Sequence, residues 1–580
     1  DGRLVEQRDR NGNTTAYNYN ADGLIETMTD PVGLETRFEY FAGKLAAITD
    51  PAGRSTRFEH DAFGHLTRII EPDGGVRRFE YDGPDGRLIR RTDQRGFGTS
   101  YDYNPFGRLQ SAERADGSIA ASRAIAMTGL VDPDTGNGTP DNPAQTVESA
   151  EVEALLFDGN GHPTRFKTDV RGRIIERTDA IGRVTSTERD ADSNPIRTVR
   201  PDGSEVERTF DARGNVLTET ELANGATTTW TYDALDQVTS VTDPRGHTTA
   251  FERDARGNLT RIVNPLGHET IMEYNAQGLM TRRVDPNGLE TVLEYNARGL
   301  VTSRTETPVD APESARTATF EYTAAGDPAL ITTPTGTVQN LTYDAEGRPI
   351  EITDNLGQRV VMEYDPAGSL IRTETRAADG SLVTVEEQAY DELHRLLETR
   401  SPHTETEDSV TQFAYDGEGN QTGVIDPNGR ITVREYDAVD RLIKEVDPAG
   451  GLIEFGYDAR SQLNRVIAPN NATTTFDFDL LSRQIAEHSP DRGTITQEYD
   501  LANNLIASTD ARGIRREMTY EALNRLKTVT FPEPGEDITY TYDSCPSGIG
   551  RICRIDDESG TLEYEYDGFG NITRTTKSEL

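Results

Sequence analysis

The side chains best spaced for chemistry are the oxygen-bearing groups of an acidic segment at 132–141. Carboxylate and amide oxygens arranged around an Asn-Gly turn could hold Ca²⁺, because that cation takes oxygen ligands. The candidate ligands are Asp132, Asp134, Asn137 and Asp141. The segment lacks the glutamate position of an EF-hand and is interrupted by prolines. An acidic surface loop without a metal is therefore the alternative interpretation.

Other catalytic patterns are absent from the sequence. The 8 histidines are scattered, and none belongs to a His-Glu-x-x-His zinc motif. No Gly-x-Ser-x-Gly elbow, P-loop or dinucleotide fingerprint occurs. Carboxylates such as Glu39 and Glu59 recur at equivalent positions, which indicates a polar face of a repeated unit rather than one tuned acid/base pair. We expect no enzymatic activity and no cofactor apart from the calcium candidate.

The 2 cysteines, Cys545 and Cys553, flank a Pro-Ser-Gly turn. They could face each other across a loop and form a disulfide in an oxidising compartment, or remain two small buried thiols. Two cysteines are too few to define the redox environment, so the sequence leaves both alternatives open.

A tyrosine followed by a glycine-centred turn recurs about every 21 residues along the chain, as in Tyr274-Asn275-Ala276-Gln277-Gly278. A fixed period of this length indicates a tandem-repeat architecture. We expect the repeat aromatics to be structural and to form a stripe along neighbouring repeats. They are Tyr19, Tyr40, Tyr81, Tyr103, Tyr232, Tyr274, Tyr295, Tyr343, Tyr364, Tyr436, Tyr457, Tyr499 and Tyr520.

A second turn lies half a period away, as in Asp243-Pro244-Arg245-Gly246. Proline fixes φ and glycine permits φ > 0, so this motif also forms a turn. Together with the turn after the tyrosine, each repeat therefore contains two turns. The six or seven residues between them alternate between apolar and polar, as in Thr291-Val292-Leu293-Glu294-Tyr295. The prediction is an all-β fold of about two dozen antiparallel hairpins, roughly 48 strands, joined in one continuous sheet.

The regular repeat spacing is interrupted by one long segment, which divides the chain into three parts. Residues 1–110 and 161–580 carry the repeats, and 111–160 read as a non-repeat insertion. Its middle is rich in Pro, Gly and Asp, and Thr146 could cap a short helix over 146–156.

Composition restricts the classes of function. The chain is 34% hydrophobic and carries a net charge of −40, which argues against nucleic-acid binding because phosphate neutralisation needs a basic face. No apolar run is long enough to span a membrane, and the first residues do not read as a signal peptide. Both ends resemble the middle of a repeat, so we expect this stretch to belong to a longer protein.

These units resemble the YD repeats of the Rhs family of bacterial polymorphic toxins, the C-component of insecticidal toxin complexes, bacterial wall-associated proteins and the shell of teneurins. The resemblance covers nearly the whole chain outside 111–160. It implies a long sheet that spirals into a hollow shell, which in the toxin members encloses a C-terminal toxin. The toxin members end their shell with a self-cleaving core segment, whereas here each Asp-Pro-x-Gly is an ordinary repeat turn.

The resemblance implies a non-catalytic shell segment, bacterial and secreted or displayed at the cell surface, whose partners are an enclosed polypeptide and further shell or cap domains. The alternative is a surface-displayed adhesion shell that binds glycans or proteins. Strand geometry supports enclosure, since roughly 48 strands of about 22 Å at about 4.8 Å spacing form a sheet with a closed radius of about 20 Å. Subtracting half of a wall thickness of about 10 Å leaves an inner radius of about 15 Å. A compact 100-residue domain is equivalent to a sphere of about 17 Å radius, so additional shell would be needed to surround it fully.

Overall fold

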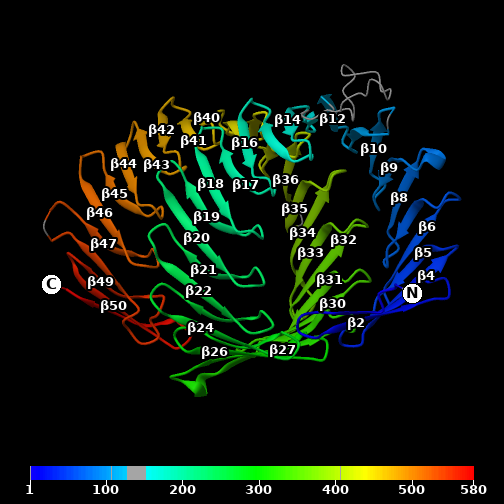
Figure 1. The fold of residues 1–580 in the computed structure, drawn as a ribbon, viewed down its shortest axis with the longest axis horizontal. Helices are drawn as coiled ribbons and strands as arrows, with labels where there is room; N and C mark the ends of the chain where they lie inside the picture. Colours follow the sequence, from blue (N-terminus) through cyan, green and yellow to red (C-terminus); the bar gives the residue numbers. More distant parts are fainter. Residues whose placement is uncertain (1, 106, 127–151, 405–406, 534, 580) are drawn as a thin grey trace, which may run out of the picture.

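A computed structural model describes residues 2–105, 107–126, 152–404, 407–533 and 535–579 (Figure 1). These residues form one sheet of 51 strands, in which each strand pairs antiparallel with the next along the chain. Two short 3₁₀ helices interrupt the loops, and the described residues contain no α-helix. The predicted all-β fold and continuous sheet are confirmed.

The first part of the sheet contains β1 (Glu6–Arg8), β2 (Thr14–Tyr19), β3 (Ile25–Thr29), β4 (Glu35–Phe41), β5 (Lys44–Thr49), β6 (Ser55–His60), β7 (Leu66–Ile70), β8 (Val76–Tyr81), η1 (Gly83–Asp85), β9 (Leu88–Thr92), β10 (Gly98–Tyr103), β11 (Leu109–Glu113), β12 (Ile119–Ala126), β13 (Val152–Phe157), β14 (Pro163–Thr168), β15 (Ile174–Thr178), β16 (Val184–Arg189) and β17 (Pro195–Val199). The middle contains β18 (Glu205–Phe210), β19 (Val216–Glu221), β20 (Ala226–Tyr232), β21 (Val238–Thr242), β22 (Thr248–Arg253), β23 (Leu259–Val263), β24 (Glu269–Tyr274), β25 (Met280–Val284), β26 (Leu289–Tyr295), β27 (Val301–Pro308), η2 (Pro312–Ser314), β28 (Arg316–Tyr322), β29 (Pro328–Thr332), β30 (Val338–Tyr343), β31 (Pro349–Asp354), β32 (Arg359–Tyr364), β33 (Leu370–Arg376) and β34 (Leu382–Tyr390). The last part contains β35 (Leu396–Thr404), β36 (Glu407–Tyr415), β37 (Gln421–Ile425), β38 (Ile431–Tyr436), β39 (Leu442–Val446), β40 (Leu452–Tyr457), β41 (Leu463–Ile467), β42 (Thr473–Phe478), β43 (Gln484–Ser489), β44 (Gly493–Tyr499), β45 (Leu505–Thr509), β46 (Arg515–Tyr520), β47 (Leu526–Thr530), β48 (Ile538–Tyr542), β49 (Ile552–Asp557), β50 (Gly560–Tyr566) and β51 (Ile572–Ser578).

Two kinds of turn connect these strands. We call the turn that follows a repeat tyrosine, or the residue in its place, a tyrosine turn, and the turn at the other end of the hairpin a proline-type turn. In the tyrosine turn at 344–348, Oδ1 of Asp344 accepts the main-chain N–H groups of Glu346 and Arg348, each at 2.9 Å. Gly347 has φ 84°, a left-handed conformation that favours glycine. The carboxylate therefore satisfies the backbone of the turn and fixes where the next strand begins.

The proline-type turns use the same chemistry. In the turn at 243–247, Oδ1 of Asp243 accepts the N–H groups of Arg245 at 2.9 Å and His247 at 2.8 Å. Gly246 occupies the left-handed position with φ 88°. In these examples an Asx side chain and a glycine close the turn at either end of a hairpin. One strand therefore ends and the next begins about every ten residues.

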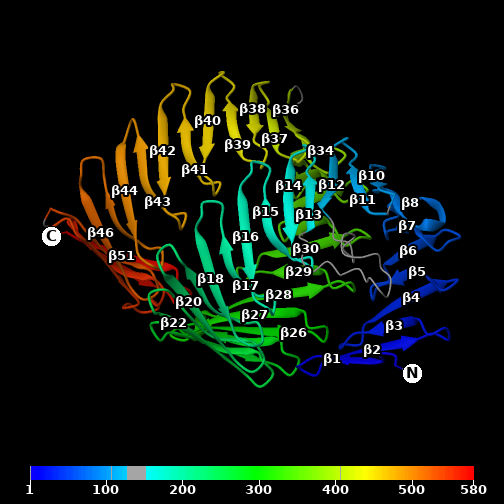
Figure 2. The same ribbon diagram turned by 45° about the horizontal axis from the view of Figure 1, so that its top comes forward.

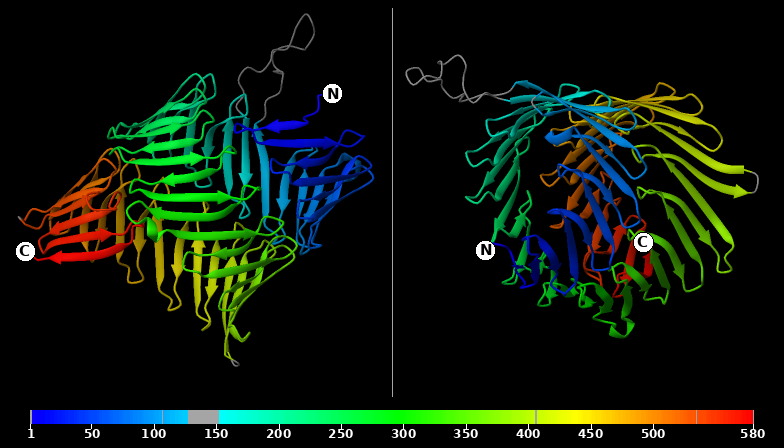
Figure 3. Two further views of the ribbon diagram at one scale, coloured as in Figure 1. Left: turned by 90° about the horizontal axis from the view of Figure 1, so that it is seen from below. Right: turned by 90° about the vertical axis from the view of Figure 1, so that its right-hand side faces the viewer.

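A bulge recurs at the repeat tyrosine. The register between β30 and β31 shifts between Thr342 and Tyr343, and the same shift occurs between Glu435 and Tyr436 in β38. A bulge bends its strand and increases the local twist. Repeated at the same place in successive hairpins, it curls the sheet into a spiral, so that early and late strands lie side by side in an open shell (Figures 2 and 3).

The sheet is a thin wall with few fully buried side chains. The buried apolar residues are Ala47, Val206, Ala226, Met272, Val385, Ala486, Ala507, Met518, Val529 and Cys553. One face carries the repeat aromatics, and the other carries charged ladders such as Glu273–Arg282–Glu290 among apolar residues such as Ile271 and Val284. Stability therefore comes from lateral pairing along the sheet rather than from one central core.

The segment at 111–160 differs from its prediction. Residues 111–126 and 152–160 belong to the same sheet, because β12 pairs with both β11 and β13. The helix predicted over 146–156 is wrong for Val152–Leu156, which lie in β13, and residues 146–151 lie outside the described residues. Pairing of β13 with strands on both sides satisfies its backbone and overrides the local capping signal.

Candidate functional site

Successive turns of the spiral meet along a seam. Hydrogen bonds across it join residues that are mostly 247 to 304 positions apart in sequence, such as Arg10 with Gly257 and Arg114 with Glu418. Each proline-type turn of the seam contacts a tyrosine turn roughly one turn of the spiral later in the chain, as Asn13 contacts Gln277 and Arg245 contacts Glu521. The seam closes the wall between turns of the spiral.

Arg245 shows how a proline-type turn binds a tyrosine turn across the seam. Its guanidinium donates to the main-chain carbonyl oxygens of Tyr520 at 3.0 Å and Glu521 at 3.1 Å, and to Oδ1 of Asn524 at 2.6 Å. These carbonyls belong to the turn itself, so one side chain holds the tyrosine turn by its backbone. The contact depends on the shape of the turn more than on its sequence.

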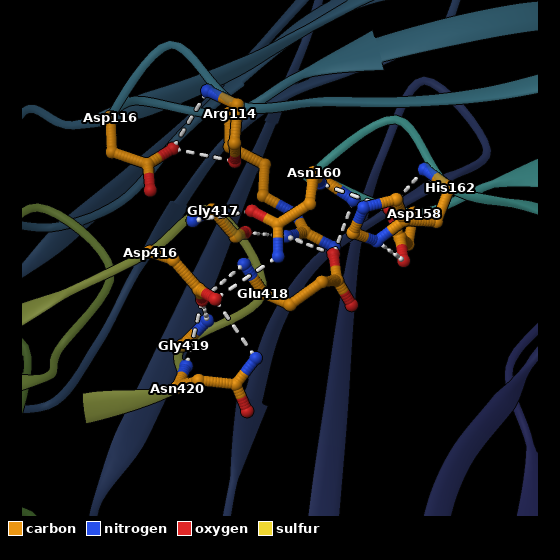
Figure 4. A network of polar contacts seen from close by, with 12 residues as sticks. Arg114, Asp116, Asp158, Asn160, His162, Asp416, Gly417, Glu418, Gly419 and Asn420 are labelled. Carbon is orange, nitrogen blue, oxygen red and sulfur yellow. Dashed lines mark hydrogen bonds and ion pairs between the residues drawn. The ribbon is translucent and has the colours of Figure 1, made fainter. Parts of the chain in front are cut away.

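A second polar network lies where β11, β13 and β36 end (Figure 4). Arg114 donates to the carbonyl oxygen of Gly417 at 3.0 Å and to Glu418 at 3.3 Å. The amide of Asn160 donates to Asp416 at 3.1 Å and accepts the N–H of Gly417 at 3.0 Å. The hairpins on both sides of residues 127–151 thus dock on one tyrosine turn, so the seam passes this point without interruption.

Ion pairs add to the seam. Arg348 contacts Asp73 at 3.1 Å, and Arg395 contacts Asp116 at 3.0 Å. The four side chains are 14 to 23% exposed, which reduces but does not remove screening by solvent. Nearby, burial raises the pKa of Glu346, whose carboxylate accepts the N–H of Asp73 at 3.1 Å.

Cys545 and Cys553 form a disulfide, with their Cα atoms 5.5 Å apart. The loop that they close stands in the position of a tyrosine turn and meets the proline-type turn at 285–289. The amide of Asn287 donates to the carbonyl oxygen of Ile549 at 2.9 Å, and the N–H of Ile549 donates back to Asn287 at 2.7 Å. The disulfide therefore shapes a docking element of the seam.

The repeat tyrosines hold adjacent tyrosine turns together. The phenolic oxygen of Tyr364 donates to the carbonyl oxygen of Pro349 at 2.9 Å, and Tyr436 bonds Gln421 in the same way at 3.0 Å. Among the predicted aromatics, the same bond to a strand-start carbonyl is made by Tyr19, Tyr81, Tyr103, Tyr232, Tyr295, Tyr343, Tyr364, Tyr436, Tyr457, Tyr499 and Tyr520. Tyr274 instead approaches Met272 Sδ at 3.9 Å, and Tyr40, the last but one residue of β4, lies opposite Leu45.

The expected aromatic stripe has arginines between its rings. Neighbouring repeat tyrosines are two strands apart, about 9.6 Å, which is too far for direct ring contact. The guanidinium of Arg441 lies 4.6 Å from the centre of the Tyr457 ring, and that of Arg483 lies 5.0 Å from Tyr499. Each arginine comes from the preceding tyrosine turn, so the ring is bridged to the repeat before it.

Several turn carboxylates have a lowered pKa and stay ionised to unusually low pH. Hydrogen bonds from Arg173 lower the pKa of Asp169 to about 2. Partial burial acts to raise the pKa of Asp344, but hydrogen bonds from the backbone and guanidinium of Arg348 outweigh it and the pKa is lowered. Burial raises the pKa of the Tyr364 phenol, which therefore remains a hydrogen-bond donor. These contacts of the turn carboxylates and phenols add to the cohesion of the wall.

The calcium candidates Asp132, Asp134, Asn137 and Asp141 lie outside the described residues. Within the described ranges, no three His, Cys, Asp or Glu side chains come together in a way that could hold a metal ion. Nor does any helix in this part of the chain have the length and apolar character needed to cross a membrane. The seam itself was not predicted, because it joins residues hundreds of positions apart.

Two protein-family models match these repeats. The model described as RHS Repeat matches residues 1–40, 42–76, 81–119, 210–248, 232–270, 253–288, 274–307 and 499–536. The model described as Teneurin YD-shell matches residues 338–514. The chain is an Rhs/YD-repeat protein. No curated protein sequence matches it.

Solved structures share the fold of this YD-repeat chain. A chain in the crystal structure of TcdB2-TccC3-Cdc42 superposes with a TM-score of 0.67 at 14% identity, covering 99% of the present chain and 40% of its own length. A chain in the structure of the Photorhabdus luminescens Tc holotoxin pore with the mutation TccC3-D651A gives 0.66 at 14% identity, covering 97% and 36%. The YD-repeat chain therefore spans about two fifths of the chains that it resembles, and at this identity the likeness shows the fold alone.

Proposed function

We propose that this YD-repeat chain is a non-catalytic wall segment that encloses and protects a polypeptide, with a toxin domain as the expected cargo. The observation that carries the proposal is the seam. Hairpin pairing closes the wall along the chain, and contacts such as those of Arg245 and Arg348 close it between turns of the spiral.

The chemistry of the wall fits enclosure better than specific recognition. The described polar groups of the seam bind one another, and the turn carboxylates bind their own backbone. Binding by enclosure needs only a continuous barrier around the cargo. The remaining partners would be further shell or cap segments, and the protein would act outside the cytoplasm as a secreted or surface-displayed shell.

A protease-protection assay tests the proposal. A small folded reporter domain is joined to the C-terminal end of the chain by a flexible linker and exposed to a nonspecific protease. We expect the reporter to survive at least about tenfold longer than when it is joined to the chain carrying Arg245→Glu and Arg348→Glu, which open the seam. Leu480→Glu, at a side chain 48% exposed, is the matched control. Equal digestion in all three fusions would contradict enclosure.

A further inference from the structure

In several charged ladders on the face opposite the repeat aromatics, each arginine lies between two glutamates. Arg282 forms ion pairs with Glu273 on one neighbouring strand and with Glu290 on the other. Arg261 and Arg372 are likewise paired with glutamates on both neighbouring strands. The positive charge of such an arginine is therefore already neutralised within the sheet.

Strands β6 to β9, near the N-terminus in Figure 1, depart from this pattern. Arg68 on β7 binds Glu59 of β6 at 2.9 Å, but its register partner on β8 is Arg78. The Cβ atoms of directly opposed residues lie about 5 Å apart, and like charges at that separation destabilise a strand pair. An acidic group from outside the sheet would relieve this repulsion.

Two further arginines of the same face lack an acidic partner. Arg57 on β6 has uncharged register partners on both neighbouring strands. Arg90 on β9 lies opposite Glu80 in register but does not come within ion-pair distance of it. Among the described residues, none of Arg57, Arg78 and Arg90 has an ion-pair partner, and all three are exposed. In a protein with a net charge of −40, these strands are a local reversal of the charge.

We call Arg57, Arg68, Arg78 and Arg90 the arginine patch. It extends over three strand spacings, about 14 Å, which is the length of about four residues of an extended peptide. A guanidinium can bind a carboxylate through two parallel hydrogen bonds, so each arginine of the patch fits one acidic side chain. The patch is short and the rest of the protein is acidic, which disfavours a long polyanion such as nucleic acid.

The exposure of the arginine patch does not depend on where the wall ends. The tyrosine turn at 275–279 is docked on the seam through Gln277, yet the side chains of Glu273 and Arg282 beside it remain 56% and 38% exposed. Glu80 and Arg90 hold the equivalent positions beside the turn at 82–87. Continuing the wall in its own plane therefore covers turns and leaves this face open.

We propose that the arginine patch is a docking surface for a short acidic segment of another polypeptide, whose carboxylates take the place of the glutamates missing from this ladder. Charge complementarity carries the assignment. The patch sets four arginines against Glu59 and Glu80, whereas acidic residues outnumber Lys and Arg by 100 to 60 in the whole chain. The contact uses the face of the sheet and does not depend on what the shell encloses.

Fluorescence anisotropy with a labelled oligoglutamate peptide tests this. We expect binding that weakens as salt is added, and that weakens at least about tenfold in the variant Arg57→Gln/Arg78→Gln/Arg90→Gln. The matched control is Arg261→Gln/Arg282→Gln/Arg372→Gln, which removes the same charge from three ladders and should bind the peptide like the parent chain. Circular dichroism and melting temperature verify that both variants fold.

Four results would overturn the proposal. The first is a parent chain that does not bind oligoglutamate at the highest concentration reached. The second is equal weakening in both triple variants, because binding would then follow net charge alone. The third is displacement of the peptide by inorganic phosphate at the same concentration, which would indicate a general anion site. The last is self-association of the parent chain that is lost in the patch variant, which would assign the surface to a second copy of this chain.

Discussion

The guanidinium of Arg348 lies 5.1 Å from the centre of the Tyr364 ring, which belongs to the next repeat. The same arginine binds Asp344 of its own turn at 2.6 Å and Asp73 across the seam at 3.1 Å. One side chain therefore links its own turn, the following hairpin and the neighbouring turn of the spiral. This explains why arginine after the turn glycine suits the wall better than lysine, since a planar guanidinium can stack and donate in several directions at once.

Comparing Arg348→Gln with Arg441→Gln isolates the seam contribution. Arg441 binds Asp437 at 2.6 Å and lies over Tyr457, as Arg348 does within its repeat, but its other described bonds stay on its own side of the seam. We expect Arg441→Gln to lower local stability by about 1 to 2 kcal/mol, and Arg348→Gln by about 1 kcal/mol more. Hydrogen exchange measures both. A double-mutant cycle with Asp73→Asn should give a coupling energy of about 0.5 to 1 kcal/mol between the two side chains. A coupling energy of zero would contradict a contribution of this seam contact to stability.

The fold could be predicted because its signals are local. An Asx residue and a residue with positive φ, usually glycine, fix most turns, and alternation predicts the strands, so Asp344 and Gly347 already specify their hairpin end. The segment around Val152 was misread because its local capping signal competes with pairing to strands on both sides. The seam could not be predicted, since contacts such as Arg245 with Tyr520 depend on curvature summed over many bulges. A polar side chain at the third position of a proline-type turn, such as Arg245, Asn287 or Asp73, is one sequence signal of docking.

Acid should loosen the wall in a defined range of pH. Asp169 has a folded-state pKa of about 2, below its ordinary value of 3.8, so the stability gained from its ionised form is fully present above about pH 4 and is lost as pH falls through about 2. Asp344, Asp437 and Asp479 have lowered pKa values as well. Urea midpoints should therefore be flat from pH 7 to about 5 and fall steeply below about pH 4. Asp169→Asn should reduce this dependence, and an unchanged slope in that variant would contradict the assignment.

Removing the disulfide should affect the seam more than the adjacent strands. Closing a loop of this length stabilises a protein by about 2 to 3 kcal/mol. In Cys545→Ser/Cys553→Ser we expect faster hydrogen exchange at 545–553 and also at 285–289, where Asn287 and Ile549 exchange hydrogen bonds. Asn287→Ala is the matched variant that loses the docking contact and keeps the disulfide. If 285–289 stayed protected in both variants, the loop would not be part of the seam.

Truncation of one repeat tyrosine should have a local effect. Tyr436 is half-buried and donates to the carbonyl oxygen of Gln421 at 3.0 Å, so Tyr436→Phe should cost about 1 kcal/mol and Tyr436→Ala about 2 to 3 kcal/mol. Each hairpin buries its ring mainly against its neighbours, and distant hairpins keep their own contacts. Hydrogen exchange should therefore rise in β37 to β40 and remain unchanged in β2 to β8. Loss of protection throughout the sheet after Tyr436→Ala would mean that the seam couples the whole spiral into one cooperative unit, and the nearest-neighbour description of this wall would be wrong.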